Sequence, residues 1–238
     1  MKKIIIIGAT SGIGRALAIL YAKKNFLVGV TGRRRALLDS LQQEFPGNIV
    51  TECFDVTGKD NIESIKNLMQ QLGGLDLLIY NSGYGEVSEN LDWEIDKNTN
   101  NINVNGFAEI VNFTFNYFVR EGKGHIAATS SIAGNRGNPF APAYSASKAY
   151  MSTYMEGLYL KANRLKLPVY ITDIQPGFVK TKMAKTKHQF WVATADKAAR
   201  QIFTALENKK RRAYITKRWW LIAKLMKLVP VFLYRKFG

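Results

Sequence analysis

The 238-residue chain is poor in cysteine, in acidic residues and in long apolar runs, and each scarcity excludes a class of protein. Its single cysteine, Cys53, excludes an internal disulfide and fits a reducing compartment, so we expect a cytoplasmic protein. The apolar run at the start ends at Gly8, short of the roughly 7–15 residues of a signal-peptide core. Residues 3–7 are better interpreted as a buried strand. No repeat, low-complexity tract or linker is present, which indicates one domain.

Acidic residues are scarce relative to basic ones. The chain has 18 Asp and Glu against 34 Lys and Arg, a formal net charge of +16. From Glu207 to the end, ten basic residues accompany one acid, so this segment holds +9 of that charge. Nucleic acid, a membrane surface or an acidic ligand could each use it. Because no nucleic-acid-binding motif is recognisable, we expect no nucleic-acid partner.

Short apolar runs alternate with longer amphipathic stretches along most of the chain. The runs are near-continuous in Val, Ile and Leu, as in strands covered on both faces. Such alternation predicts an α/β protein with a doubly wound parallel sheet of about seven strands. We expect one domain over residues 1–216 and a basic, apolar helical tail over 217–238. The expected strands are 3–7, 27–31, 49–54, 75–80, 125–130, 169–175 and 213–216, and three of the expected helices are 13–24, 35–45 and 62–72.

A glycine-rich stretch, GATSGIG, follows the first expected strand. Its glycines would let the backbone turn sharply and approach a pyrophosphate, and the helix that follows would offer its unpaired N–H groups to the phosphates. The spacing is G-x-x-x-G-x-G and not G-x-G-x-x-G, and a turn without a ligand is the alternative. The stretch predicts nucleotide contacts through Gly8, Thr10, Ser11, Gly12, Ile13 and Gly14.

Arginine, and no acid, follows the second expected strand in the stretch VTGRRR. An acid there would hold a free ribose 2′-hydroxyl, whereas arginine holds a 2′-phosphate. Arg33 and Arg34 therefore favour NADP(H) over NAD(H), with a solvated basic turn as the alternative. Asp55 closes the third expected strand. It is either a contact to the adenine amino group or an ordinary aspartate at a strand end.

Tyr144 and Lys148 stand four residues apart in the stretch YSASK. On a helix this spacing places two side chains one above the other on the same face. A phenol has a pKa near 10, and a neighbouring ammonium favours the phenolate and lowers that pKa. Because a general acid or base works best with a pKa near the operating pH, the pair predicts a proton-transfer group.

Four further motifs accompany the pair and the glycines at 8–14: Tyr80-Asn81-Ser82-Gly83, Asn103-x-x-Gly106, Ser131 and Pro176-Gly177. Together with Tyr144-x-x-x-Lys148, these motifs resemble those of the short-chain dehydrogenase/reductase family. The resemblance covers the chain to about residue 216 and implies a Rossmann-like fold and a homodimer or homotetramer. Ile7, Tyr80 and Ser82 depart from the family pattern, which leaves local details open.

The resemblance implies four catalytic residues. Tyr144 exchanges a proton with the carbonyl or alcohol oxygen, and Ser131 hydrogen-bonds the same oxygen. Lys148 binds the nicotinamide ribose, and Asn103 holds a water that connects Lys148 to solvent. Family spacing selects Ser131 over its neighbour Ser130.

Further contacts to NADPH are implied by the same motifs. No metal is expected, because His188 has no ligand partners in the sequence. Beyond the glycine stretch and the two arginines, the cofactor contacts are Asp55, Val56, Asn81, Gly83, Tyr144, Lys148, Pro176, Gly177, Val179 and Thr181.

The sequence therefore predicts an NADPH-dependent oxidoreductase that moves a hydride between nicotinamide and a small-molecule carbonyl or secondary alcohol. A non-catalytic NADP(H)-binding sensor or scaffold on the same fold is the alternative, but we would expect it to have lost Tyr144, Lys148 or Ser131. Residues 178–195 should form a substrate lid. Its Phe190 and Trp191 either favour an apolar substrate or pack the lid onto the body.

The tail, residues 218–238, mixes aromatic and aliphatic residues with cations. Lys224, Lys227 and Pro230 argue against a membrane span, which needs about 20 predominantly apolar residues. Two interpretations stay open. The tail lies in a membrane interface with its lysines toward anionic headgroups, which would suit a membrane-associated location and a lipid-like substrate. Alternatively, it packs on the body or on a second subunit.

Overall fold

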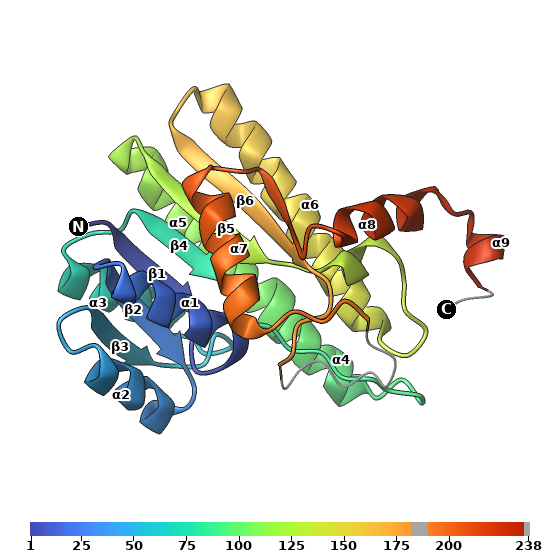
Figure 1. Ribbon diagram of the computed structural model, residues 1–238, viewed down its shortest axis with the longest axis horizontal. Helices are drawn as coiled ribbons and strands as arrows, with labels where there is room; N and C mark the ends of the chain where they lie inside the picture. The colour runs from blue at the N-terminus through green and yellow to red at the C-terminus, as the bar shows by residue number, and fades with distance from the viewer. Residues whose placement is uncertain (182–189, 236–238) are drawn as a thin grey trace.

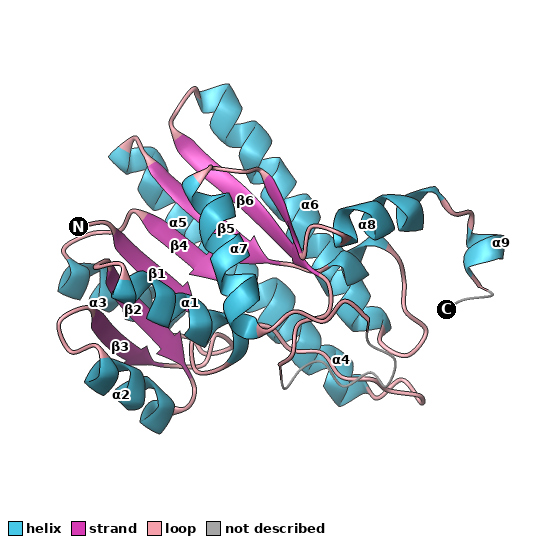
Figure 2. Ribbon diagram, in the orientation of Figure 1, coloured by secondary structure: helices cyan, strands magenta, loops and turns pink. Residues whose placement is uncertain are grey.

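The structure, a computed structural model, describes residues 1–181 and 190–235, and a parallel sheet lies at its centre. Within these residues the strands pair in the order β3-β2-β1-β4-β5-β6-β7, and every pair is parallel (Figures 1 and 2). The predicted α/β, Rossmann-like sheet is confirmed. The strands are β1 (Lys3–Ile7), β2 (Leu27–Gly32), β3 (Ile49–Cys53), β4 (Leu77–Tyr80), β5 (Gly124–Thr129), β6 (Val169–Pro176) and β7 (Arg212–Ile215).

Helices cover both faces of the sheet because its strands are apolar on both sides. In β1, Ile4 and Ile6 join one hydrophobic cluster while Ile5 and Ile7 join the other, as the two-residue repeat of a strand requires. The first cluster is closed by α1 (Gly12–Lys23), α2 (Arg35–Glu44) and α7 (Ala195–Glu207). The second is closed by α3 (Asn61–Leu72), α5 (Phe107–Glu121) and α6 (Pro142–Leu165).

The remaining helical segments lie at the edges of these layers. The helix α4 (Trp93–Asn100) continues through a π-helical turn, η1 (Asn101–Gly106), into α5, and a 3-10 turn, η2 (Ile132–Asn135), follows β5. The chain ends in α8 (Trp219–Leu228) and α9 (Val231–Tyr234). Among the described residues, no helix combines the length and apolar character that crossing a bilayer requires.

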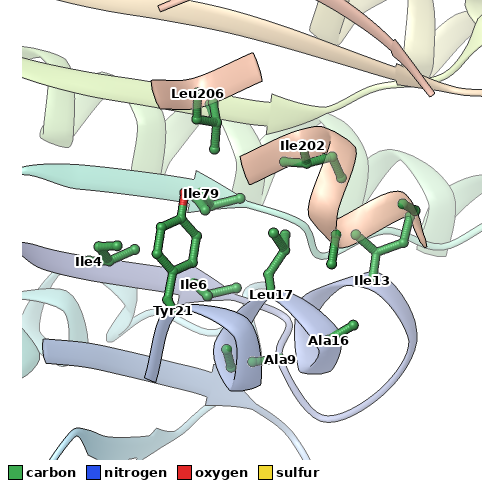
Figure 3. Close-up of a cluster of buried hydrophobic side chains, with 14 of the residues drawn as sticks. Ile4, Ile6, Ala9, Ile13, Ala16, Leu17, Tyr21, Ile79, Ile202 and Leu206 are labelled. Carbon is green, nitrogen blue, oxygen red and sulfur yellow. The ribbon is translucent and has the colours of Figure 1, made fainter. Parts of the chain in front are cut away.

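Helix α7, near the C-terminal end of the sheet domain, packs on α1, near its N-terminal end (Figure 3). Leu17 and Tyr21 of α1 are fully buried, and Ile202 and Leu206 of α7 belong to the same cluster. Burying an aliphatic side chain of this size stabilises a fold by about 1.5–3 kcal/mol. These contacts fix α1, and with it the glycine stretch at its start, against the sheet.

The change of direction in strand order falls between β1 and β4, where Ile7 pairs with Tyr80. In open α/β sheets the ligand crevice forms outside the carboxyl ends of the strands at this point. The chain leaves β1 at Gly8 and β4 at Asn81, so two of the predicted motifs begin at the expected crevice.

His125 is a buried titratable group near the start of β5, with 9% of its surface exposed. The Thr172 hydroxyl donates to the Lys210 carbonyl at 2.6 Å, so the His125 Nε2–H donates to Thr172 Oγ1 at 2.9 Å. Burial, reinforced by Lys209 and Lys2, lowers the pKa of His125 from 6.5 to about 4. The folded protein therefore holds a neutral imidazole.

We expect the free energy of unfolding to fall as the pH drops from 6.5 toward 4, because the unfolded chain then binds a proton that the folded protein resists. A pKa displacement of this size corresponds to about 3 kcal/mol. His125→Gln keeps a donor for Thr172 and should remove this part of the pH dependence. Urea unfolding across that pH range measures it, and an unchanged slope in the variant would contradict the assignment.

Candidate active site

The glycine stretch packs tightly against the end of β4. Gly8 and Gly12 have φ of +86° and +58°, a region that favours glycine. A Cβ on Gly8 would lie 2.7 Å from the backbone nitrogen of Ser82, and one on Gly14 would overlap the Gly8 carbonyl. The loop therefore forms a backbone-lined cradle at the N-terminus of α1, the arrangement that accommodates a pyrophosphate. It contains Gly8, Thr10, Ser11, Gly12, Ile13 and Gly14.

Asn81 holds this cradle in place. Its Nδ2 donates to the Gly8 carbonyl at 3.2 Å, and its Oδ1 accepts from Thr129 Oγ1 at 3.1 Å. One side chain thus connects the ends of β1, β4 and β5. Gly83 follows two residues later in a half-buried loop.

The segment after β6 reaches the other side of the cradle. The Thr181 methyl lies 3.1 Å from the position of a Cβ on Gly12. Val179 pairs with Ala193, and the Lys180 N–H donates to the Ala193 carbonyl at 2.8 Å. The two ends of the predicted lid, 178–195, therefore lie side by side next to the cradle. Residues 182–189, including His188, lie outside the described residues.

The two predicted arginines take different partners. The Arg34 guanidinium donates to Ser11 Oγ at 2.9 Å and to Thr10 Oγ1 from Nε at 3.2 Å, which places it on the cradle. Arg33 instead pairs with Asp55 at 3.3 Å. Burial would raise the pKa of Asp55, but hydrogen bonds from Thr57 and the Arg33 charge outweigh burial and lower it. Contact of Asp55 with adenine stays a prediction.

Val56 and Asn103 are buried, unlike the two exposed arginines. Val56 is buried, and its carbonyl is so close to Gly106 of η1 that a side chain there would overlap it. Asn103 is fully buried in the same π-helical turn, a feature that often marks functional sites. Its Nδ2 donates to the Tyr84 carbonyl at 2.7 Å and to Ser147 Oγ at 2.9 Å. It therefore links the loop after β4 to α6.

Ser131 and its neighbour Ser130 are clearly distinguished by their contacts. Ser130 is buried, and its hydroxyl lies within hydrogen-bond distance of two acceptors, the Asp173 carboxylate and the Ile174 carbonyl, so its side chain is satisfied inside the fold. Ser131 is half-buried, caps η2 by accepting from the Ala133 N–H at 3.1 Å, and lies close enough to the Tyr144 side chain to influence its pKa. Of the two serines, Ser131 is the one beside the phenol.

Lys148 is buried one helical turn beyond Tyr144 in α6. Its Nζ donates to the Thr129 carbonyl at 2.9 Å and lies 5.8 Å from the centre of the Tyr144 ring. Burial lowers the pKa of Lys148 to about 8, although the Asp173 charge opposes this. An amine with such a pKa can both hold and release a proton near neutral pH.

The sequence prediction that Lys148 lowers the pKa of Tyr144 is wrong for this structure. Burial raises the pKa of Tyr144, and the hydrogen bond from Ser131 offsets only part of the rise. Desolvation disfavours the charged form of both groups, phenolate and ammonium alike. Because Lys148 is oriented toward the Thr129 carbonyl, its charge does not compensate. Tyr144 is therefore a protonated phenol at neutral pH.

Pro176 ends β6, and Gly177 follows it under a tail side chain. The indole of Trp219 covers Gly177 so closely that a Cβ there would overlap it. Trp219 is 2% exposed and lies edge-on to Phe178 at 5.3 Å between ring centres. It also contacts Phe190 and Trp191, so these two aromatic residues of the predicted lid pack against the tail.

Comparison with known proteins decides the family. The sequence model of the short chain dehydrogenase family matches residues 2–190. The chain belongs to this family. As a short-chain dehydrogenase/reductase, it is a nicotinamide-dependent enzyme that acts on CH–OH or C=O groups.

Individual relatives of this short-chain dehydrogenase agree. An uncharacterized oxidoreductase of Myxococcus xanthus is 37% identical over 190 residues, which cover 77% of this chain and 74% of that protein. A short chain dehydrogenase/reductase from Burkholderia phymatum in complex with NAD gives a TM-score of 0.85 at 19% identity, covering 94% and 92% of the two chains. The structure "ElxO with NADP Bound" gives 0.79 at 20%, covering 90% and 96%. These two solved structures show the fold alone.

Some residues that shape this dehydrogenase site escaped the sequence analysis. Gly85 packs on the Tyr144 ring, Gly134 packs on the Lys148 backbone, and Trp219 covers Gly177. In the sequence, each of these residues is only a glycine or a tryptophan outside the motifs. Its role in the site cannot be predicted until the residue that it contacts in space is known.

We expect Gly85→Ala to destabilise the protein, because the added methyl would overlap the Tyr144 ring. Overpacking of this kind costs about 1–3 kcal/mol. Gly47→Ala is the matched control, since nothing lies within 4 Å of its Cβ position. Thermal denaturation of both variants measures the effect, and equal melting temperatures would show that the loop yields freely.

Proposed function

We propose that this short-chain dehydrogenase/reductase uses NADPH to reduce a small-molecule carbonyl to a secondary alcohol. The observation that supports this best is the convergence of the Ser131 hydroxyl and the Tyr144 phenol beside the buried Lys148. Two hydroxyls in that arrangement can bind one substrate oxygen. Asn103 is bonded to Ser147 on the same helix.

The protonation state of Tyr144 favours reduction. Because burial keeps the phenol protonated, Tyr144 can donate its proton to the oxygen of a carbonyl whose carbon accepts the hydride. The bound nicotinamide supplies that hydride. Ser131 donates to the same oxygen and stabilises its developing negative charge. Lys148, with a pKa of about 8, can return a proton toward the phenolate, and Asn103 would hold the water that links it to solvent.

NADPH is the proposed cofactor because Arg34 is already on the cradle. Its guanidinium is bonded to both Thr10 and Ser11, beside the position expected for a ribose 2′-phosphate. Arg33 is exposed and can leave its ion pair with Asp55, since exposed pairs contribute only about 0–1 kcal/mol. The backbone cradle at Gly8, Gly12 and Gly14 fits the pyrophosphate.

Self-association is a further part of the proposal. The outer faces of α5 and α6 form a shallow groove lined by Phe113, Tyr150 and Tyr154 among others, and Tyr150 is 39% exposed. A second copy of this chain would cover these rings, so we propose a homodimer or homotetramer.

A non-catalytic NADP(H) sensor is the competing function. It needs the cradle and the arginines but has no use for a serine hydroxyl placed beside a half-buried phenol. The pair Ser131–Tyr144 therefore favours the enzyme.

Tyr144→Phe should lower turnover by about 10²–10⁴-fold, because it removes the proton donor and almost no volume. NADPH affinity should stay nearly unchanged, whereas Lys148→Met should lower both turnover and affinity. Tyr150→Phe, on the exposed side of the same helix, is the control. NADPH consumption over a panel of ketones gives the rates, and near-normal turnover in Tyr144→Phe would reject the mechanism.

The protein should bind NADPH at least about tenfold more tightly than NADH, since a charge-assisted hydrogen bond is worth about 1.5–3 kcal/mol and tenfold needs about 1.4. Arg34→Ala should remove most of this preference. Arg35→Ala, a neighbouring exposed arginine, should retain it. Titration calorimetry with both nucleotides tests this, and equal affinities in the unmodified protein would exclude a 2′-phosphate site.

A further inference from the structure

The start of the tail is fixed to the body at the edge of the active site. Trp219 is buried over Gly177, directly after β6. Near the other end of α8, the Arg136 guanidinium donates to the Met226 and Val229 carbonyls. A cation at this position also complements the negative end of the helix dipole. The orientation of α8 is therefore set by the body.

The outer side of this tail carries apolar side chains without cover in the described structure. Figure 1 shows α8 and α9 extending from one side of the molecule, with α9 apart from the sheet and its helices. Leu221, Leu225 and Leu228 have the spacing of residues on one face of α8, and an exposed apolar face marks an interaction site. Each of its members is between 40% and 77% exposed: Trp220, Leu221, Leu225, Leu228, Val231, Phe232 and Leu233.

Cations border this apolar surface. The Lys224 ammonium lies 4.5 Å from the centre of the Trp220 ring, and Lys227 follows one turn later. Lys217 and Arg218 precede α8, Arg235 follows α9, and no acidic residue occurs after Glu207. A second copy of the chain would bring like charges together. An anionic surface would neutralise them, and a helix with apolar and cationic sides is the form that lies in a lipid interface.

We propose that the exposed side of α8 and α9 docks on an anionic lipid surface. The apolar side chains enter the boundary between headgroups and acyl chains, and the cations contact the headgroups. Because Trp219 and Arg136 hold α8 against the body, docking keeps the edge of the active site near the bilayer. An active site near the bilayer suits an apolar, lipid-like carbonyl substrate, and this inference about the substrate rests on the proposed function. The inference that the tail docks on lipid does not rest on it.

Co-sedimentation of the full chain with vesicles tests the proposal. We expect at least about tenfold stronger binding to phosphatidylcholine vesicles that contain phosphatidylserine than to phosphatidylcholine alone. Binding should weaken at high salt, because salt screens exposed charges. Absence of binding to either vesicle, or equal binding to both at all salt concentrations, would overturn the proposal.

Two pairs of variants assign the binding to the tail. Leu221→Asp with Leu225→Asp should reduce binding at least about tenfold, while Leu37→Asp with Leu160→Asp, two exposed leucines elsewhere, should not. Lys224→Glu with Lys227→Glu should abolish the preference for anionic vesicles. The charge-matched control is Lys23→Glu with Lys123→Glu, both exposed and outside the tail. Binding unaffected by the tail variants would contradict the assignment.

Light scattering and a soluble ketone separate the remaining outcomes. If the protein does not bind vesicles and Leu221→Asp with Leu225→Asp converts an oligomer to a monomer, the surface is a subunit interface and the lipid proposal fails. NADPH consumption with a water-soluble ketone should be the same in the tail variants as in the unmodified chain. Loss of vesicle binding with intact turnover would leave the proposed function standing, and binding without turnover on any ketone would refute the function alone.

Discussion

Parallel pairing of β1 with β4 is the constraint on which the rest of the site depends. This pairing brings together the carboxyl ends of two strands that lie far apart in the sequence, with Ile7 beside Tyr80. Asn81 then bonds to Gly8 and Thr129, so the ends of three strands form one surface. A helix N-terminus faces that surface and can bind phosphate. Three of the four proposed catalytic residues, Ser131, Tyr144 and Lys148, follow β5, which is the next strand in the sheet.

Burial is the second physical theme, because it sets the chemistry of the pair in α6. In water, an ammonium that shares a helix face with a phenol should favour the phenolate and lower the pKa of the phenol. Inside the protein, desolvation keeps both Tyr144 and Lys148 nearer their neutral forms. A protonated phenol beside an amine with a pKa of about 8 is suited to donating a proton and then recovering it.

The tail combines a buried residue with an exposed surface, and the two have different physical roles. Trp219 contributes aromatic packing to the end of β6 and to Phe178. The residues beyond it leave apolar rings and cations on the outside. The sequence left two interpretations of the tail open, packing on the body and a membrane interface, and each applies to a different part of the tail. Packing on the body accounts for Trp219, and lipid docking is the proposal for the exposed residues beyond it.

The sequence by itself determined the fold class, the positions of the strands along the chain and the placement of Tyr144 and Lys148 one turn apart on a helix. Strand periodicity and helix spacing are local properties, so a sequence carries them directly. Strand ends were predicted to within one or two residues. Only the tertiary structure decided that Ser130 hydrogen-bonds Asp173 and that Trp219 covers Gly177. It also decided that Arg33 pairs with Asp55, whereas Arg34 lies on the cradle. It also reversed the expected pKa of Tyr144. Burial and contacts between residues far apart in the chain carry no local signature, so no pattern of neighbouring residues could have supplied them.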